Sequence, residues 1–214
     1  MTDAAIKAMI HLLDDSDQEV VSMVEQQIRT LGPSIIPVLE SEWESESLNP
    51  ILQSKIENLI HDFQWQSVKT RLQVWKESGG MDLLEGMWIL ATYRYPDYSF
   101  NDLKVEMDQL YYEVWPQMRE DLHPMDQVKV MNTVMFEQLK FGPNSKNFHA
   151  ANNSFINNVL TSKKGNPISL CVIYMWIAQK LGLPIYGVNL PNLFVLTYKQ
   201  NGLQFYIKIG RAHV

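Results

Sequence analysis

The chain has 214 residues, 46% of them hydrophobic and 20% charged, an ordinary composition for one or two globular domains with a substantial core. Its net charge of −6 and pI near 5.4 argue against nonspecific binding of DNA or RNA, and its single cysteine excludes an internal disulfide and a multi-thiolate metal site. Because no basic and apolar leader follows Met1, we expect no signal peptide, no membrane partner and a cytoplasmic protein.

The first 78 residues are predicted to be helical. Apolar side chains recur at helical spacing in three segments, and a long helix then begins at Asn49-Pro50 and ends at Gly79-Gly80. The string LLDDSDQEVVSMVEQQIRTLGPSIIPVLE resembles one HEAT-type repeat, although arrays of such repeats need about three or more units for stability. We therefore expect residues 1–78 to form a HEAT-like helical cap.

Three more helices are predicted in the middle of the chain. They cover Met81–Tyr93, Phe100–Leu122 with a bend or break at Pro116, and Pro124–Leu139, and a polar loop follows from Gly142 to Asn152. The aromatic residues of these helices sit at helical spacing, so we expect core packing rather than ligand stacking for them. They are Trp88, Tyr111, Tyr112 and Trp115.

A buried helix and a short antiparallel sheet are predicted near the end of the chain. Every residue from Leu170 to Ala178 is apolar, so this helix has no polar face, and it is far shorter than the roughly 20 residues that span a bilayer. Short β-rich runs follow at 185–189, 193–198 and 203–207, and Asn201-Gly202 between the last two predicts a hairpin. The expected fold class is α+β and predominantly α-helical.

Four motifs carry a family resemblance. The strings are NSFINNVL, KKGNPISL, LGLPIYGV and NLPNLFVL, all between residues 153 and 196. Together they resemble the transglutaminase-like domain of the SirB1 family, whose fold is similar to that of transglutaminases and papain-like cysteine proteases. The resemblance implies a transglutaminase-like domain at residues 79–208, truncated at its C-terminal end, with the helical cap before it.

The resemblance also implies that the catalytic triad has degenerated. Active members carry the nucleophilic cysteine at the start of the buried helix, and their spacing from the Leu-Gly turn leads to Pro167. The only cysteine, Cys171, lies roughly 6 Å or one turn deeper, away from the unpaired N–H groups that lower a thiol pKa. Leu193 occupies the position of the basic histidine, and Lys208 that of the third residue. The sequence therefore favours a protein without enzymatic activity.

Weak catalytic candidates remain: Cys171, Ser169 and, as a compensating base in the polar loop, His149. The residues that we expect around the degenerate cleft are Asn153, Asn157, Asn166, Pro167, Ser169, Asn189, Asn192 and Leu193. In the resembled fold the loop before the helix faces the strand ends, so amide and hydroxyl groups there would hydrogen-bond a ligand or a partner loop. No histidine pair has the spacing of metal ligands, so we expect neither a metal nor a cofactor.

The last six residues, Ile209 to Val214, can be encoded by a common short-read sequencing adapter. We therefore expect residues 209–214 to be a non-native tail that does not pack on the core, and the native sequence to diverge at Lys208.

The sequence is consistent with three functions. The favoured one is a catalytically degenerate domain that acts in protein binding or regulation. The second is an active hydrolase or acyltransferase that uses Ser169 or Cys171 with an unrecognised base, and the third is a helical scaffold without a site. The expected partner is a protein, and the oligomeric state is left open.

Overall fold

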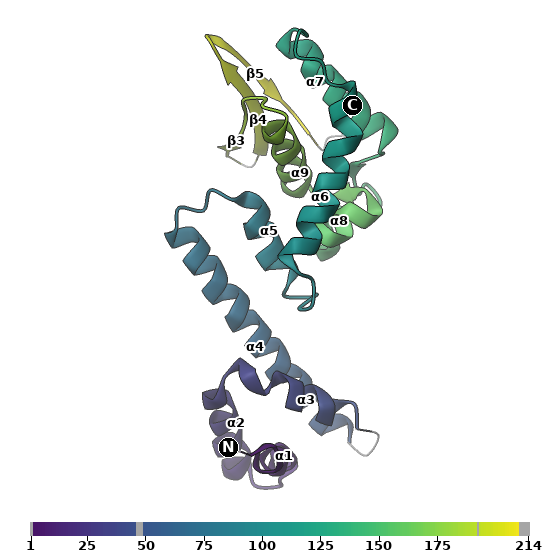
Figure 1. Cartoon of the computed structure of the whole chain (residues 1–214). Coiled ribbons are helices and arrows are strands. Elements are labelled where there is room, and N and C mark those ends of the chain that lie inside the picture. The colour runs from purple at the N-terminus through teal and green to yellow at the C-terminus, as the bar shows by residue number, and fades with distance from the viewer. Residues whose placement is uncertain (1, 46–48, 192, 210–214) are drawn as a thin grey trace. The chain divides into compact units, whose positions relative to one another are not determined.

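The computed structural model describes residues 2–45, 49–191 and 193–209 (Figure 1). The chain divides into two compact units, Met1–Val74 and Trp75–Val214, and each is described by itself. The division lies inside the long helix α4 (Pro50–Glu77), before Gly79-Gly80. The last turn of α4 belongs with the second unit because the indole N–H of Trp75 donates to the carbonyl of Asp82 at 2.8 Å.

The first unit is helical, as its sequence predicts. Helices α1 (Asp3–His11), α2 (Gln18–Leu31) and α3 (Ile36–Trp43) enclose a core with the first part of α4. The side chain of Asp17 caps α2 by accepting the N–H of Glu19 at 2.8 Å. The buried core residues of this unit are Ile6, Ile10, Leu13, Ile28, Ile35, Leu39, Leu52, Ile56, Leu59 and Phe63.

The second unit combines helices with two small sheets, which confirms the predicted α+β and mainly helical fold. The helices are α5 (Leu83–Ala91), α6 (Phe100–Val114), α7 (Pro124–Asn132), α8 (Ile156–Ser162) and α9 (Pro167–Lys180). Strands β1 (Gly142–Pro143) and β2 (Lys164–Gly165) pair in parallel, and β3 (Ile185–Leu190), β4 (Leu193–Gln200) and β5 (Leu203–Ile207) form an antiparallel sheet in that order.

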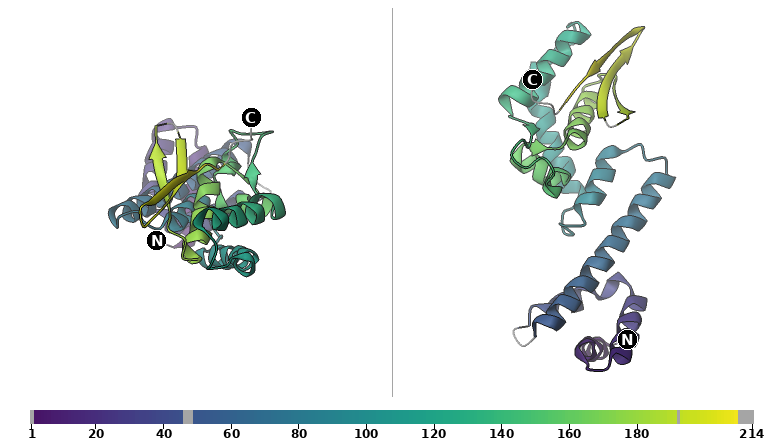
Figure 2. Two further views of the ribbon diagram at one scale, coloured as in Figure 1. Left: turned by 90° about the horizontal axis from the view of Figure 1, so that it is seen from above. Right: turned by 180° about the vertical axis from the view of Figure 1, so that it is seen from behind.

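Helix α9 is the centre of the second unit. Helices α5, α6 and α8 and strands β3 and β4 all contact it, and α9 lies between the three-stranded sheet and α6 in Figure 1 and in the view from behind in Figure 2. The apolar run from Leu170 to Ala178 is buried apart from Trp176, which is half-buried. Tyr174 donates its hydroxyl to the side chain of Asn132 at 3.1 Å, which satisfies this buried polar group.

The boundaries of the middle helices differ from the predicted ones for local reasons. Helix α5 begins at Leu83 because the carboxylate of Asp82 caps it by accepting the N–H of Glu85 at 3.0 Å. Helix α6 ends at Val114 and passes into a short 3₁₀ turn that contains Pro116. A π-helical turn, Thr133–Gln138, follows α7, and α8 lies where no helix is predicted from the sequence.

Two features at the end of the chain compare differently with their predictions. The β4–β5 hairpin turns at Asn201 and Gly202, both with positive φ, which confirms the Asn-Gly signal. The expectation that the tail does not pack on the core is wrong for its first residue. The apolar side chain of Ile209 is 3% exposed and joins the core of the second unit. Residues 210–214 lie outside the described part of the chain.

Candidate functional site

The start of α9 is closed by side chains of the chain itself. The side-chain oxygen of Asn166 accepts the N–H of Ser169 at 2.8 Å, so Asn166 is the N-cap of the helix. Its amide nitrogen donates to the hydroxyl of Ser154 at 2.8 Å. Pro167 occupies the first helical position, where its missing N–H is no loss. Both polar atoms of the Asn166 side chain therefore have hydrogen-bond partners within the fold.

Ser169 is bonded inward and has no access to solvent. Its side chain is 0% exposed, and its hydroxyl donates to the carbonyl of Asn153 at 2.9 Å. Gly165 lies so close that a Cβ there would come within 2.5 Å of the hydroxyl oxygen. The side chain of Asn153 in turn donates to the carbonyls of Asn147 and Phe148, at 2.8 and 2.9 Å. These residues hold a loop against the helix, and they leave no space for a substrate at the hydroxyl.

Cys171 is buried, as its place in the apolar run predicts. It is 0% exposed, and burial raises the pKa of its thiol to about 12. Since the thiolate is the nucleophilic form, the thiol is almost entirely in its unreactive form at neutral pH.

The two remaining candidates of this region lie apart from Cys171. His149 is exposed in the loop before α8, and its ring meets Phe148 edge-on with centroids 5.3 Å apart. Asn157 lies on α8, and its side-chain oxygen is buried without a hydrogen-bond partner among the described residues. No hydrogen bond within the described part of the chain connects either residue to Cys171 or Ser169.

The strand side of the expected cleft has other neighbours. Asn189 on β3 pairs with Phe194 on β4, and half-buried Leu193 pairs with Leu190. Asn192 lies outside the described residues. The structure thus joins Asn153, Asn166 and Ser169 by hydrogen bonds, but no hydrogen bond between described residues links that group to Asn189 or Leu193.

A cavity of about 680 Å³, which is not predicted from the sequence, lies beside β3. Its walls come from the C-terminal half of α9, the turn after it, β3 and the residues before α5. The lining residues are Gly80, Met81, Leu83, Met175, Gln179, Gly182, Leu183, Pro184, Tyr186, Gly187, Asn189 and Phe194. None of them carries a charge. Gly187 inside a strand was the available signal, because glycine there marks a close approach of other groups: a Cβ would lie 2.6 Å from the Phe194 ring.

Other kinds of site can be judged over the described ranges 2–45, 49–191 and 193–209. Within them no three His, Cys, Asp or Glu side chains gather as metal ligands would. None of the helices in those ranges combines the length and the hydropathy that a bilayer span requires.

Comparison with known proteins gives partial relatives. F-box only protein 21 of Mus musculus is 39% identical over 70 residues, which cover 33% of this chain and 11% of that protein. A UPF0162 protein of Xylella fastidiosa is 31% identical over 132 residues, covering 58% of this chain and 46% of its own length. A UPF0162 protein of Vibrio cholerae is 24% identical over 122 residues, covering 57% and 45%. The chain therefore spans less than half of each of these relatives.

No solved structure matches the chain significantly. Residues 101–209, which are half of the chain and include α6 to β5, match the family described as the transglutaminase-like superfamily. This match contains the start of α9, the buried thiol and the paired strands described above, and the chain belongs to the transglutaminase-like superfamily.

Proposed function

We propose that this chain is a transglutaminase-like domain of the SirB1 type that has lost its catalytic centre and acts by binding a segment of a partner protein. The observation that carries the proposal is the chemistry at the start of α9, where the resemblance puts the nucleophile. Pro167 stands at that place, the hydroxyl of Ser169 is bonded inward, and the thiol of Cys171 is buried.

The absence of a general base at the expected position also supports the loss of catalysis. A cysteine or serine nucleophile needs an adjacent group that takes its proton. Leu193 stands at the base position and has no proton acceptor, while His149 is exposed in a loop and contacts Phe148. Loss of catalysis therefore explains the geometry of all these positions at once.

The edge of β3 supports a binding role. Backbone groups in an antiparallel pair point alternately toward the neighbouring strand and away from it. The N–H of Lys199 donates to the carbonyl of Pro184 at 3.0 Å, which sets this alternation at the start of the pair. Counting along β3 then puts the backbone groups of Gly187 and Asn189 on the open edge, and both residues line the cavity. A partner segment in extended conformation can pair with such an edge.

The cavity defines the chemistry of that segment. Its volume of about 680 Å³ is within the range of roughly 300–1,000 Å³ that ligand sites occupy. Because none of its lining residues is charged, a charged side chain would lose water there without gaining a partner. We therefore propose an uncharged, partly apolar segment in extended conformation, with backbone hydrogen bonds to β3 and apolar side chains in the cavity.

Loss of catalysis is tested by transamidation of a glutamine peptide with a fluorescent primary amine and by hydrolysis of a chromogenic ester. The wild type should show the same background rates as Ser169→Ala and Cys171→Ala. Leu193→His should add no turnover, because Pro167 supplies no nucleophile. Turnover of the wild type that either Ser169→Ala or Cys171→Ala abolishes would establish an active enzyme instead.

Binding is tested with a labelled peptide of alternating valine and threonine and with its twin, N-methylated at every second residue. The twin lacks the N–H groups that would pair with β3, so its affinity should fall by about tenfold, which corresponds to about 1.4 kcal/mol. Asn189→Pro removes an N–H from the open edge of the sheet, where proline is tolerated. This variant should lower the affinity for the unmodified peptide by a similar factor. Tyr206→Ala on β5 is the control and should change nothing. Equal binding of both peptides would rule out strand pairing, and no binding would rule out this site.

A further inference from the structure

The outward face of α6 and the 3₁₀ turn after it carry large apolar side chains where an exposed helix normally carries polar ones. Val105 is 50% exposed, Tyr112 64% and Trp115 56%, and these three residues are named the α6 patch. The opposite face of the helix is buried through Leu103, Met107, Leu110 and Val114. Since each helical residue turns by about 100°, Val105 and Tyr112, seven positions apart, lie on one line along the outward side. The prediction that Tyr112 and Trp115 pack in the core is therefore wrong.

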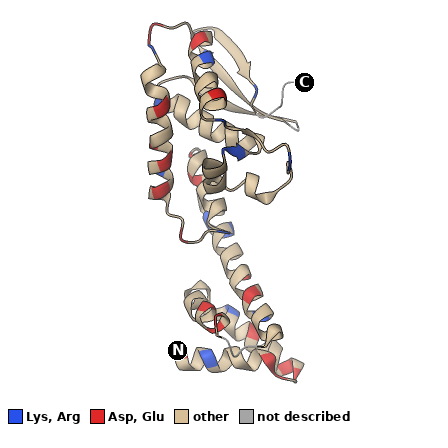
Figure 3. Ribbon diagram, turned by 90° about the vertical axis from the view of Figure 1, so that its right-hand side faces the viewer, with Lys and Arg blue, Asp and Glu red and all other residues tan. Residues whose placement is uncertain are grey.

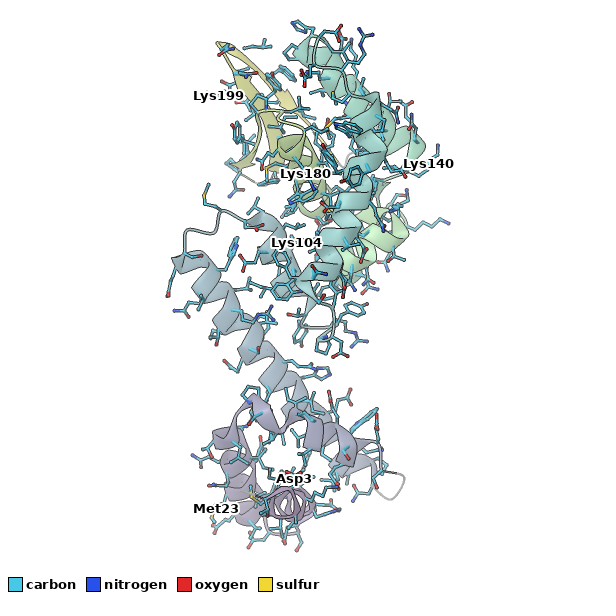
Figure 4. The ribbon with its side chains drawn as sticks, viewed as in Figure 1. Asp3, Met23, Lys104, Lys140, Lys180 and Lys199 are labelled. Carbon is cyan, nitrogen blue, oxygen red and sulfur yellow. The ribbon has the colours of Figure 1, made fainter. Side chains whose placement is uncertain are left out.

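Neighbouring contacts hold this surface in place. The rings of Tyr111 and Tyr112 meet edge-on, with centroids 5.3 Å apart. The ammonium of Lys180, labelled in Figure 4, extends from the end of α9 toward α6 and lies 4.9 Å from the ring centroid of Tyr111 and 4.8 Å from that of Trp176. Lys180 also forms an ion pair with Asp108. These contacts restrain Tyr111 and, through it, the ring of Tyr112, which lowers the ordering cost of binding at that residue.

The patch lies in the most acidic part of the second unit. Residues 100–121 contain six carboxylates and two basic side chains, a formal charge of −4 within a chain of −6. Three of the carboxylates, Asp102, Glu106 and Glu113, follow a second line along α6 beside the patch, and the acidic positions of the helix are red in Figure 3. Glu106 and Glu113 also line a cavity of about 220 Å³, and Lys163 is the basic residue among its described lining residues.

We propose that the α6 patch binds a basic amphipathic helix of a partner protein. The seven-residue spacing of Val105 and Tyr112 suits a second helix laid along α6, because a heptad repeat returns to the same side of both helices. The apolar face of the partner covers the patch, and its flanking Arg or Lys side chains reach Asp102, Glu106 and Glu113. Arginine can in addition stack on the rings of Tyr112 and Trp115. The charge of α6 selects this occupant, since an acidic helix or a nucleic acid would be repelled.

This proposal does not depend on the proposed function, because the α6 patch and the cavity beside β3 share no residue. The probes are two labelled helical peptides of about three heptads, with leucine on the apolar face and either arginine or glutamate at the flanking positions. Fluorescence anisotropy should show at least about tenfold tighter binding of the arginine peptide, and its affinity should fall as salt rises from about 50 to about 200 mM.

Three variants locate the binding surface. Tyr112→Ala should lower the affinity for the arginine peptide by about tenfold. Glu113→Lys should lower the affinity for the arginine peptide and raise the affinity for the glutamate peptide. Tyr206→Ala is the matched control, because Tyr206 is 62% exposed but lies on β5, and it should bind like the wild type. Equal affinity for both peptides, failure of the arginine peptide to bind, or unchanged binding by Tyr112→Ala would each overturn the proposal. Self-association of the chain that Tyr112→Ala abolishes would also overturn it, since the occupant would then be a second copy.

Discussion

Replacing Gly165 by alanine is the sharpest test of how the start of α9 is built. The new Cβ would lie 2.5 Å from the hydroxyl oxygen of Ser169 and 2.9 Å from a methyl carbon of Val159, distances that force a shift. Overpacking of this kind costs about 1–3 kcal/mol. Displacing the hydroxyl also weakens its bond to Asn153, worth about 1 kcal/mol, while the stiffer unfolded chain offsets roughly half a kcal/mol or more. We expect Gly165→Ala to lower the free energy of unfolding by about 2 kcal/mol.

The assay uses Cys171 as a reporter of the second unit. Because this single thiol is buried in α9, it reacts with an alkylating reagent only when the unit opens, so labelling against urea gives the free energy of that unit. Gly142→Ala is the matched control on the paired strand β1, where the nearest atom to the new Cβ, the Lys164 ammonium, is 3.6 Å away. This control should stay within about 0.5 kcal/mol of the wild type.

A double-mutant cycle separates the two contacts of the new methyl group. In a Ser169→Ala background the 2.5 Å contact is gone, so Gly165→Ala should cost at least about 0.5 kcal/mol less there than in the wild type. If Gly165→Ala matched the wild type, or if Gly142→Ala cost as much, the close packing described at the start of α9 would be incorrect.

The remaining predictions concern buried polar groups of α9. Cys171 in the folded protein should resist iodoacetamide at neutral pH and react at the rate of a free thiol in urea; rapid labelling of the folded chain would contradict its burial. Cys171→Ala should cost about 1 kcal/mol or less at neutral pH. Because folding raises the pKa of this thiol from 9.0 to about 12, the unfolded state loses the proton first, and stability should fall between these values as pH rises. At about pH 10 the wild type should lose about 1.4 kcal/mol relative to Cys171→Ala, and parallel pH profiles of the two proteins in urea titrations would refute this. Tyr174→Phe should cost about 1–2 kcal/mol in the same titration, because it removes the bond to Asn132, and a neutral effect would show that the bond contributes nothing.

Several secondary-structure elements that depend on residues close together in the chain were predicted correctly from the sequence. The apolar run of α9 and the Asn201-Gly202 turn each depend on residues that are neighbours in the chain, so they can be identified without tertiary information. Helix α8 was not predicted because only seven residues form it and several of them are polar. Its apolar residues Ile156, Val159 and Leu160 do follow helical spacing, but so few positions are consistent with other structures.

Features that depend on distant segments could not be predicted. The cavity beside β3 is formed by α9, the turn after it and the residues before α5. No single stretch of sequence indicates that these segments lie next to one another. Helical spacing alone placed Tyr112 and Trp115 in the core, although periodicity shows only which residues share a face and not which face is covered. The hydrogen bonds of Asn166 to Ser154 and of Ser169 to the carbonyl of Asn153 could not be predicted for a similar reason, because the partners are 12 and 16 positions away in the chain.

The burial of α9 on all sides affects how the second unit is synthesised. A helix without a polar face cannot be stable in water alone, and β3 and β4, which cover one side of it, leave the ribosome only after it. Between these two moments the side of the nine-residue apolar run Leu170 to Ala178 that β3 and β4 later cover lies exposed. The nascent chain should therefore engage a holding chaperone during that interval, and ribosome complexes stalled when Lys180 has left the exit tunnel but β3 and β4 have not should aggregate more readily than complexes in which β5 has emerged.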